Sequence, residues 1–222
     1  MKKSKIVSPS VILAIESAIG QGSIALVSGS RILAESRGEA SRSETLSVEI
    51  EKLADKLPAG LDSIGRIAVS SGPGSFTGLR IGIATALGLA RALDVPVSGI
   101  ALLEAIASQT ALETDFMVAT SLGRSDVCFQ YFSPGGIPAG PPQALSFVEF
   151  TKFTAGRKNP LIAESSLFGR ISGETEAFGQ LELLRAPENL AAVIAFQSEI
   201  SSDREGKIEP IYVQSPRAIS VF

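Results

Sequence analysis

One glycine-rich stretch indicates how this chain folds, and it reads Ser71-Gly72-Pro73-Gly74-Ser75-Phe76-Thr77-Gly78-Leu79-Arg80. It follows an apolar run over Ile64–Val69, which is typical of a buried strand, and it leads into a helix predicted over Gly78–Leu93. Unpaired N–H groups and the dipole at a helix N-terminus attract anions, so the turn is a candidate site for phosphate or carboxylate. Its spacing fits neither a P-loop nor a Rossmann turn. A tight turn with Thr77 as the helix N-cap is the structural alternative.

Small residues recur along the helix that follows this turn. Gly78, Gly82, Ala86 and Ala90 lie at four-residue spacing and form one stripe, although glycine inside a helix costs about 1 kcal/mol relative to alanine. The other side of the helix is also apolar. Two interpretations follow, a helix buried between two layers of one fold and a helix-pair interface with another subunit, and we favour the interface.

Hydrophobic periodicity predicts the remaining elements. In the first half these are strands over Val11–Glu16, Ser23–Val27, Arg31–Glu35 and Val95–Ser98, a helix that opens with a capping box at Ser41–Glu44 and stops at Pro58, and a helix over Ala101–Ala111. In the second half they are strands over Phe116–Thr120, Asp126–Phe132, Pro160–Ala163 and Ile208–Val213, and helices over Phe147–Thr154 and Pro187–Glu199. This order predicts an α/β protein with mixed sheets flanked by helices, in two lobes over residues 1–110 and 111–222. The similar start of both halves hints at a duplicated lobe.

The composition limits the kinds of catalytic and metal site that this chain can form. The chain has 222 residues, no histidine and one cysteine. These counts exclude Ser-His-Asp and Cys-His nucleophiles, internal disulfides, and zinc sites built from histidine or several cysteines. Cys128 lies in an apolar stretch and is expected to be a small buried side chain. With a net charge of −3 and no run of like charges, the chain is not expected to bind nucleic acid tightly by itself.

A cytoplasmic protein without membrane contact is expected. The N-terminal apolar run Val11–Ile15 is shorter than the core of a signal peptide, and Arg80 and Arg91 interrupt the most apolar helix. A single cysteine fits a reducing compartment.

The glycine-rich stretch resembles the TsaB (YeaZ) family, which belongs to the bacterial machinery that makes threonylcarbamoyladenosine in certain tRNAs. The resemblance runs from Gly72 through Ala90 and into Val95-Pro96-Val97. Further matches are Ile12-Leu13-Ala14-Ile15, Ser43-Glu44-Thr45-Leu46, Leu103-Glu104-Ala105-Ile106 and the C-terminal Glu209-Pro210-Ile211-Tyr212-Val213. The likeness is strong over about residues 11–110 and thin over the rest.

The resemblance implies an actin-like (ribonuclease H-like) two-lobed fold of the ATPase superfamily. It implies a subunit without catalytic or metal-binding residues that activates a catalytic paralogue, TsaD, and that joins a TsaE-like ATPase and, through the complex, tRNA. Family members pair through their first two helices, which agrees with the stripe of small residues. The predicted partner interface comprises Leu46, Ile50, Leu53, Gly78, Leu79, Gly82, Ile83, Ala86 and Ala90. An isolated chain is expected to form a homodimer through the same apolar surface.

Three departures from the family pattern argue against a nucleotide site in this chain alone. Glu16-Ser17-Ala18 stands for Asp-Thr-Ser in the first hairpin, Arg42-Ser43-Glu44 for His-Ser-Glu, and Ser121-Leu122-Gly123-Arg124 for an Asp-Ala-Arg turn. We therefore expect ATP and Mg²⁺ only in the assembled complex. An actin-like kinase or ATPase is the alternative function, with a weak anion or nucleotide site at Glu16, Ser17, Gly72, Gly74, Ser75 and Thr77. The older family label of peptidase conflicts with the lack of histidine and with a buried cysteine.

Overall fold

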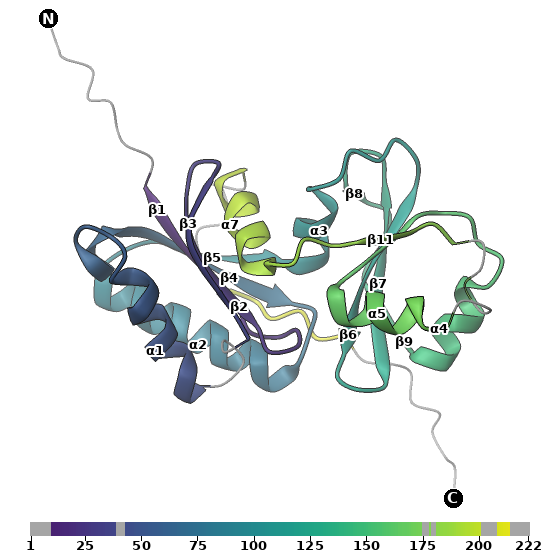
Figure 1. The fold of residues 1–222 in the computed structure, drawn as a ribbon, viewed down its shortest axis with the longest axis horizontal. Coiled ribbons are helices and arrows are strands. Elements are labelled where there is room, and N and C mark those ends of the chain that lie inside the picture. The colour runs from purple at the N-terminus through teal and green to yellow at the C-terminus, as the bar shows by residue number, and fades with distance from the viewer. Residues whose placement is uncertain (1–9, 39–42, 175–177, 179–180, 201–207, 214–222) are drawn as a thin grey trace, which may run out of the picture.

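The computed structural model describes residues 10–38, 43–174, 178, 181–200 and 208–213. Its first sheet contains β1 (Val11–Glu16), β2 (Ser23–Ser28), β3 (Arg31–Arg37), β4 (Ile64–Gly72) and β5 (Val97–Ala101). The strands lie in the order β3-β2-β1-β4-β5 (Figure 1). Short turns join the antiparallel strands β1, β2 and β3, whereas β1, β4 and β5 run parallel and are connected through helices. The three strands predicted over Val11–Glu16, Ser23–Val27 and Arg31–Glu35 are confirmed, and they form an antiparallel meander.

Two helices, α1 (Ser43–Ala54) and α2 (Phe76–Leu93), cover one face of this sheet. Leu46, Ile50 and Leu53 of α1 pack into the same core cluster as Leu13 and Ile15 of β1. Their helical spacing therefore marks the face of α1 that lies on the sheet. The capping box predicted at the start of α1 includes residues 41 and 42, which lie outside the described residues. A short 3-10 helix, η1 (Gly60–Ser63), leads from α1 into β4.

The opposite face is covered by α3 (Leu102–Ala107) and α7 (Leu190–Ile200) (Figure 1). Ala191 and Ile194 of α7 share a core cluster with Ile12, Ala14 and Val27 of the first sheet. The chain thus returns to the first lobe after completing the second sheet. The division at residue 110 did not anticipate this crossing, because nothing in the sequence of α7 indicates which sheet it covers.

The second sheet is built from β6 (Phe116–Leu122), β7 (Asp126–Ser133), β8 (Ile137–Pro138), β9 (Gln143–Ser146), β10 (Leu161–Ala163) and β11 (Leu183–Arg185). Its order is β11-β10-β6-β7-β8, with β9 also paired to β7. Helices α4 (Phe147–Thr154) and α5 (Ser165–Ser172) lie in this lobe. The hairpin of β6 and β7, the helix α4 and the strand β10 confirm the sequence-based predictions. The short strands β9 and β11 and the helix α5 were not predicted.

One topology occurs in both lobes. An antiparallel hairpin, β1–β2 or β6–β7, pairs through its first strand with a parallel strand, β4 or β10, and that strand pairs with a further parallel strand, β5 or β11. A helix precedes β4 and β10 in each case, and another follows each of them. This repetition agrees with the duplicated lobe that the sequence hinted at.

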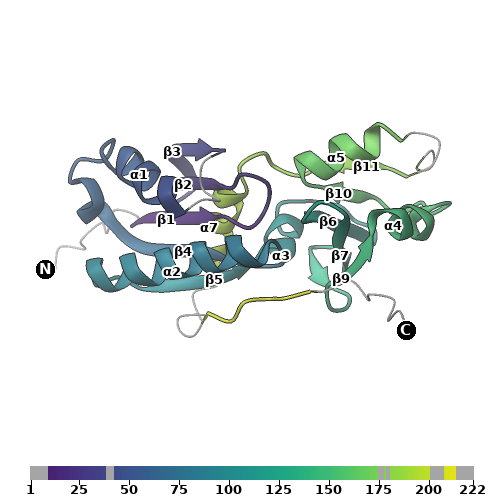
Figure 2. The same ribbon diagram turned by 90° about the horizontal axis from the view of Figure 1, so that it is seen from below.

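The C-terminal segment Ile208–Val213 corrects another prediction. It is not a strand of either sheet but an extended segment that passes beneath β5 toward the second lobe (Figure 2). The backbone N–H of Ile211 donates to the carbonyl of Ser71 at 2.7 Å. Ile208 and Ile211 of this segment are half-buried against the first lobe.

Helix α2 has the length and apolar character of a membrane-spanning helix, with 18 residues and a mean hydropathy of 1.3. Core helices of folded domains reach the same values. Gly78, Gly82 and Ala86 of α2 are buried within the first lobe, and 28% of the helix is buried in total. A large part of this apolar helix therefore faces outward.

Candidate functional site

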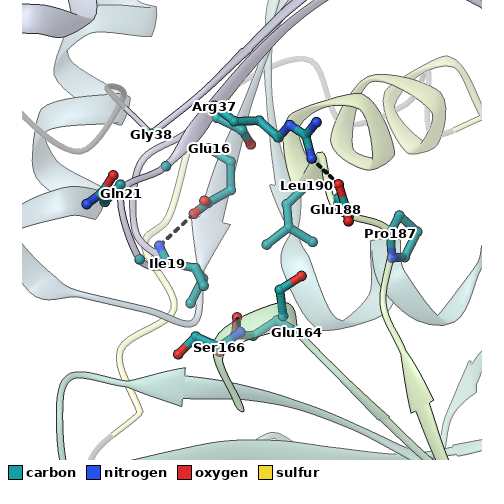
Figure 3. Close-up of a pocket in the computed structure, with 14 residues that line it drawn as sticks. Glu16, Ile19, Gln21, Arg37, Gly38, Glu164, Ser166, Pro187, Glu188 and Leu190 are labelled. Carbon is teal, nitrogen blue, oxygen red and sulfur yellow. Dashed lines mark hydrogen bonds and ion pairs between the residues drawn. The ribbon is translucent and has the colours of Figure 1, made fainter. Parts of the chain in front are cut away.

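A cavity of about 220 Å³ lies where the two lobes meet (Figure 3). Its wall is formed by the turn between β1 and β2, the end of β3, the N-terminus of α5 and the segment that leads into α7. The polar side chains that decide its chemistry are Glu16, Arg37, Glu164, Ser166 and Glu188. The cavity gives a small ligand access to residues of both lobes.

Glu16 is the last residue of β1 and is buried, with 1% of its surface exposed. Its Oε1 accepts hydrogen bonds from the backbone N–H groups of Ala18 and Ile19, at 2.7 and 3.0 Å. Burial raises the pKa of Glu16 from 4.5 to about 7; the two N–H groups oppose this rise, and repulsion by Glu164 adds to it. The Glu16 carboxyl group thus changes its charge close to neutral pH.

Glu164 lies across the cavity and is the N-cap of α5. Its Oε2 accepts from the N–H of Ser166 at 2.7 Å, and its Oε1 accepts from the N–H of Leu167 at 2.9 Å. The hydroxyl of Ser121, at the end of β6, also donates to Oε1 at 2.7 Å. With 4% of its surface exposed, Glu164 ties α5 to the hairpin of the second lobe.

At the rim of the cavity, Arg37 forms an ion pair with Glu188, and its guanidinium also lies 4.0 Å from the carboxylate of Glu35. The side chains of Arg37 and Glu188 are 48% and 59% exposed, so water screens this pair and it contributes little to stability. The pair matters for the site because the Arg37 guanidinium at the rim is already bonded to a carboxylate of the same chain.

The glycine-rich turn does not line this cavity, which corrects the grouping of Gly72, Gly74, Ser75 and Thr77 with Glu16. The turn packs on the β1–β2 turn instead, where the N–H of Ser75 donates to the carbonyl of Ala18 at 2.8 Å. A Cβ on Gly74 would lie 2.5 Å from the Cβ of Ala18, so glycine is required by this close approach. The glycines therefore serve backbone packing.

The N-cap of α2 also differs from the prediction. Ser75, not Thr77, caps the helix, because the Ser75 hydroxyl accepts a hydrogen bond from the N–H of Gly78 at 3.3 Å. Thr77 is exposed within the first turn. Ser17, the other predicted anion-site residue, donates its hydroxyl to the carbonyl of Gly78 and so holds α2 against β1 rather than facing the cavity.

The nine residues predicted as the partner interface are all buried against the chain's own first sheet, which corrects that assignment. A Cβ on Gly78 would lie 2.1 Å from the backbone oxygen of Ser17, and one on Gly82 would lie 2.2 Å from the Ser17 hydroxyl. The neighbour that the small stripe approaches is thus the end of β1. The residues concerned are Leu46, Ile50, Leu53, Gly78, Leu79, Gly82, Ile83, Ala86 and Ala90.

The exposed face of α2 is a different set of residues. Phe76 and Leu87 expose 51% and 46% of their surface. Ala84, Gly88 and Ala92 are also exposed and follow one another at four-residue spacing. A second stripe of small residues is therefore present in the sequence, on the opposite side from the one that was assigned to a partner. Periodicity alone does not distinguish which stripe faces the sheet.

Aromatic and cationic groups border this face at its N-terminal end. The Arg80 guanidinium lies 3.7 Å from the centre of the Phe76 ring, and the ring of Tyr212, from the C-terminal segment, lies 5.0 Å from it. Val48 of α1, on the same face of the sheet, is 48% exposed. We call the exposed side chains Val48, Phe76, Arg80, Ala84, Leu87, Gly88, Arg91 and Tyr212 the helix face.

The chain is similar to proteins of threonylcarbamoyladenosine formation. Residues 38–138 match the family model of TsaD, tRNA N6-adenosine threonylcarbamoyltransferase. The tRNA threonylcarbamoyladenosine biosynthesis protein TsaB of Bacillus subtilis is 47% identical over 45 residues, or 20% of each chain. The structure of YeaZ from Pseudomonas aeruginosa covers 92% of this chain and all of its own, with a TM-score of 0.64 and 22% identity. The similarity is thus to TsaB (YeaZ) proteins and to the TsaD family model.

A longer alignment, of lower identity, relates this chain to an uncharacterized protein of Mycobacterium tuberculosis, which is 36% identical over 116 residues. The aligned segment covers 52% of this chain and spans about half, 53%, of that relative. The actin-like ATPase fold implied by the resemblance is confirmed by solved structures of that fold.

The actin-like fold implies a nucleotide with Mg²⁺ between the lobes, and the residues of this chain do not fit one. The turn and helix N–H groups at the cavity are bonded to Glu16 and Glu164, and both carboxyl groups are buried beside the space a phosphate would need. No lysine lines the cavity within the described residues. In the same part of the chain, no group of three His, Cys, Asp or Glu is placed to hold a metal ion.

Proposed function

We propose that this chain is a non-catalytic subunit in the formation of N6-threonylcarbamoyladenosine in tRNA, and that it acts by pairing with a TsaD-like catalytic paralogue. The TsaB name of its relatives and the TsaD family match support the reaction. A cytoplasmic location, a TsaE-like ATPase as a further partner, and contact with tRNA through the assembled complex belong to the same proposal.

The observation that carries the pairing is the helix face. Leu87 exposes 46% of its surface beside Ala84 and Gly88, and the small size of these two residues lets another helix approach closely. A Cβ on Gly88 would meet nothing within 4 Å, so the space above this position is open. An apolar helix face with small residues at its centre is a surface that a second helix pair can cover.

Charge supports a partner with the same architecture. The exposed side of α2 carries Arg80 and Arg91. The exposed side of α1 carries Glu44 and Glu51 along with Lys52, and Asp55 and Lys56 follow directly after it. In a two-fold arrangement, α2 of one subunit meets α1 of the other, which brings arginine near carboxylate. A paralogue with the same two helices, or a second copy of this chain when the paralogue is missing, satisfies this geometry.

The experiment is reconstitution of the modification with the TsaD-like and TsaE-like proteins of the same organism, ATP and an unmodified tRNA. Product should form with this chain and fall to background when it is omitted. Equal product without the chain contradicts the proposal, and so does product from this chain with ATP and tRNA when the TsaD-like protein is left out.

A further inference from the structure

Two pairs of backbone N–H groups lie at or next to the cavity between the lobes, with Ile19 and Ser166 among the lining residues, and each pair donates to a carboxyl group of the chain itself. Ala18 and Ile19, in the tight turn after β1, donate to Oε1 of Glu16 at 2.7 and 3.0 Å. Figure 3 shows the hydrogen bond from Ile19. Ser166 and Leu167, in the first turn of α5, donate to the two oxygens of Glu164 at 2.7 and 2.9 Å. The pairs come from different lobes.

Neighbouring N–H groups in a tight turn or at a helix N-terminus are donors that bind phosphate oxygens in proteins. A carboxyl oxygen offers the same kind of acceptor, so here these donors are already satisfied. The rim follows the same pattern, because the Arg37 guanidinium is paired with Glu188. Three groups suited to an anion are therefore each bonded to a carboxyl group from within the chain.

We propose that Glu16 and Glu164 occupy the two anion positions of the cleft and thereby close it to phosphate-bearing ligands. A phosphate that entered would have to displace both side chains, or remain next to two carboxyl groups without these two pairs of donors. The inference concerns the cleft alone and does not depend on pairing through the helix face.

Local stability is an incomplete explanation for these two residues. Helix N-caps are usually Ser, Thr, Asp or Asn, whose short side chains reach the same N–H groups, whereas Glu164 performs this role with a longer side chain that also accepts from Ser121. Glu16 and Glu164 are 1% and 4% exposed, and both line one cavity although they come from separate lobes. Repulsion between the two contributes to the raised pKa of Glu16. Such an arrangement costs stability, so its effect on the cleft is the better explanation.

The test uses the full-length chain and two probes, inorganic pyrophosphate and MgADP, with binding measured by titration calorimetry. The wild-type chain should bind neither probe in the millimolar range. The variant Glu16→Ala/Glu164→Ala frees both N–H pairs, so it should bind pyrophosphate at least about tenfold more tightly than the wild type, because hydrogen bonds to charged groups are strong. The amide signals of Ala18, Ile19, Ser166 and Leu167 should shift on addition of pyrophosphate to this variant.

Two control variants distinguish the occupation of the N–H groups from the effect of the negative charges. Glu16→Gln/Glu164→Gln removes both charges but keeps an oxygen acceptor at each position, and Glu188→Ala removes a carboxylate of the same cavity without freeing a backbone N–H. Neither should gain affinity. The proposal is overturned when the wild type binds the probes as tightly as the alanine variant, when a folded alanine variant gains nothing, or when either control gains as much. If the double variant does not fold, the same comparison between Glu16→Ala and Glu16→Gln decides, since α5 then keeps its cap.

Discussion

The hydroxyl of Ser17 donates a hydrogen bond to the carbonyl of Gly78 over 2.8 Å, which joins the end of β1 to the first turn of α2. The pair is buried and separated by 61 residues in sequence. It explains why the small residues of α2 face inward: the helix lies so close to the strand end that a side chain at position 78 would overlap the backbone of Ser17.

Substituting the two glycines on opposite sides of α2 should therefore have opposite effects. Gly78→Ala places a Cβ 2.1 Å from the backbone oxygen of Ser17, which cannot move away as a flexible side chain would, so we expect a loss of about 1–3 kcal/mol in the free energy of unfolding. Gly88→Ala has open space and should gain about 0.5–1 kcal/mol from helix propensity. Urea unfolding at low protein concentration measures both values. Equal effects of the two substitutions would contradict the assignment of the two helix sides.

The helix face should control association. Leu87→Asp introduces a charge at the centre of the exposed apolar surface, so we expect pairing with the TsaD-like protein, and homodimer formation by the isolated chain, to weaken at least about thirtyfold. Sedimentation velocity and light scattering measure the association, and thermal melting checks that the fold is kept. Val148→Asp is the matched control, because Val148 is 63% exposed on α4 in the other lobe. Loss of pairing in both variants, or in neither, argues against this surface.

The buried Glu16 should make stability depend on pH. Its pKa is about 7 in the folded chain and near 4.5 when unfolded, so the folded state holds a proton that the unfolded state releases between these values. The contribution of Glu16 to stability is complete below about pH 4.5 and falls as the pH rises toward 7 and above. Glu16→Gln keeps the acceptor oxygen without the charge. Its unfolding free energy should match the wild type near pH 4 and exceed it by at most about 3 kcal/mol at pH 8.

Chemical denaturation of Glu16→Gln and wild type across this pH range provides the comparison. Glu149→Gln serves as a control for a lowered pKa, because hydrogen bonds from Ser146 hold the pKa of the exposed Glu149 below its usual value. A difference between Glu16→Gln and wild type that is constant from pH 4 to pH 8 would show that the ionisation of Glu16 is not responsible.

The cap of α2 can be located by two alanine substitutions. Ser75→Ala removes the hydroxyl that accepts from the N–H of Gly78 and should cost about 1 kcal/mol of stability. Thr77→Ala alters an exposed residue inside the first turn and should have no cost, since alanine has the higher helix propensity. Thermal unfolding of the two variants measures the difference. A larger effect of Thr77→Ala would support Thr77, rather than Ser75, as the N-cap.

Much of the fold could be predicted because its signals are local. The strands β1 to β3, the hairpin β6–β7 and the helices α1, α2 and α4 follow from runs and spacings within single segments. The short elements β9, β11 and α5 lack such a signal, since three or four strand residues, or two helical turns, carry too few periods to detect.

The candidate site was harder to predict because its residues come from different segments. Glu16 was identified from the resemblance, because it stands where the family has the Asp of Asp-Thr-Ser, but Glu164 follows a short strand and precedes a helix that was not predicted. The orientation of α2 depended on Ser17 and Ala18, which contact the helix across a long separation in sequence. Both stripes of small residues in α2 can be read from the sequence. The sequence does not show which of the two stripes the end of β1 covers.

The packing of α7 has a consequence for how the protein is made. This helix covers Ile12, Ala14 and Val27 of the first sheet, although it is encoded some 160 residues after them. As the chain leaves the ribosome, the first lobe keeps one apolar surface open to water until almost the entire polypeptide has been translated. A gene fragment that ends at residue 110 would therefore encode an incomplete core, and the two halves must be expressed together to reach the native state.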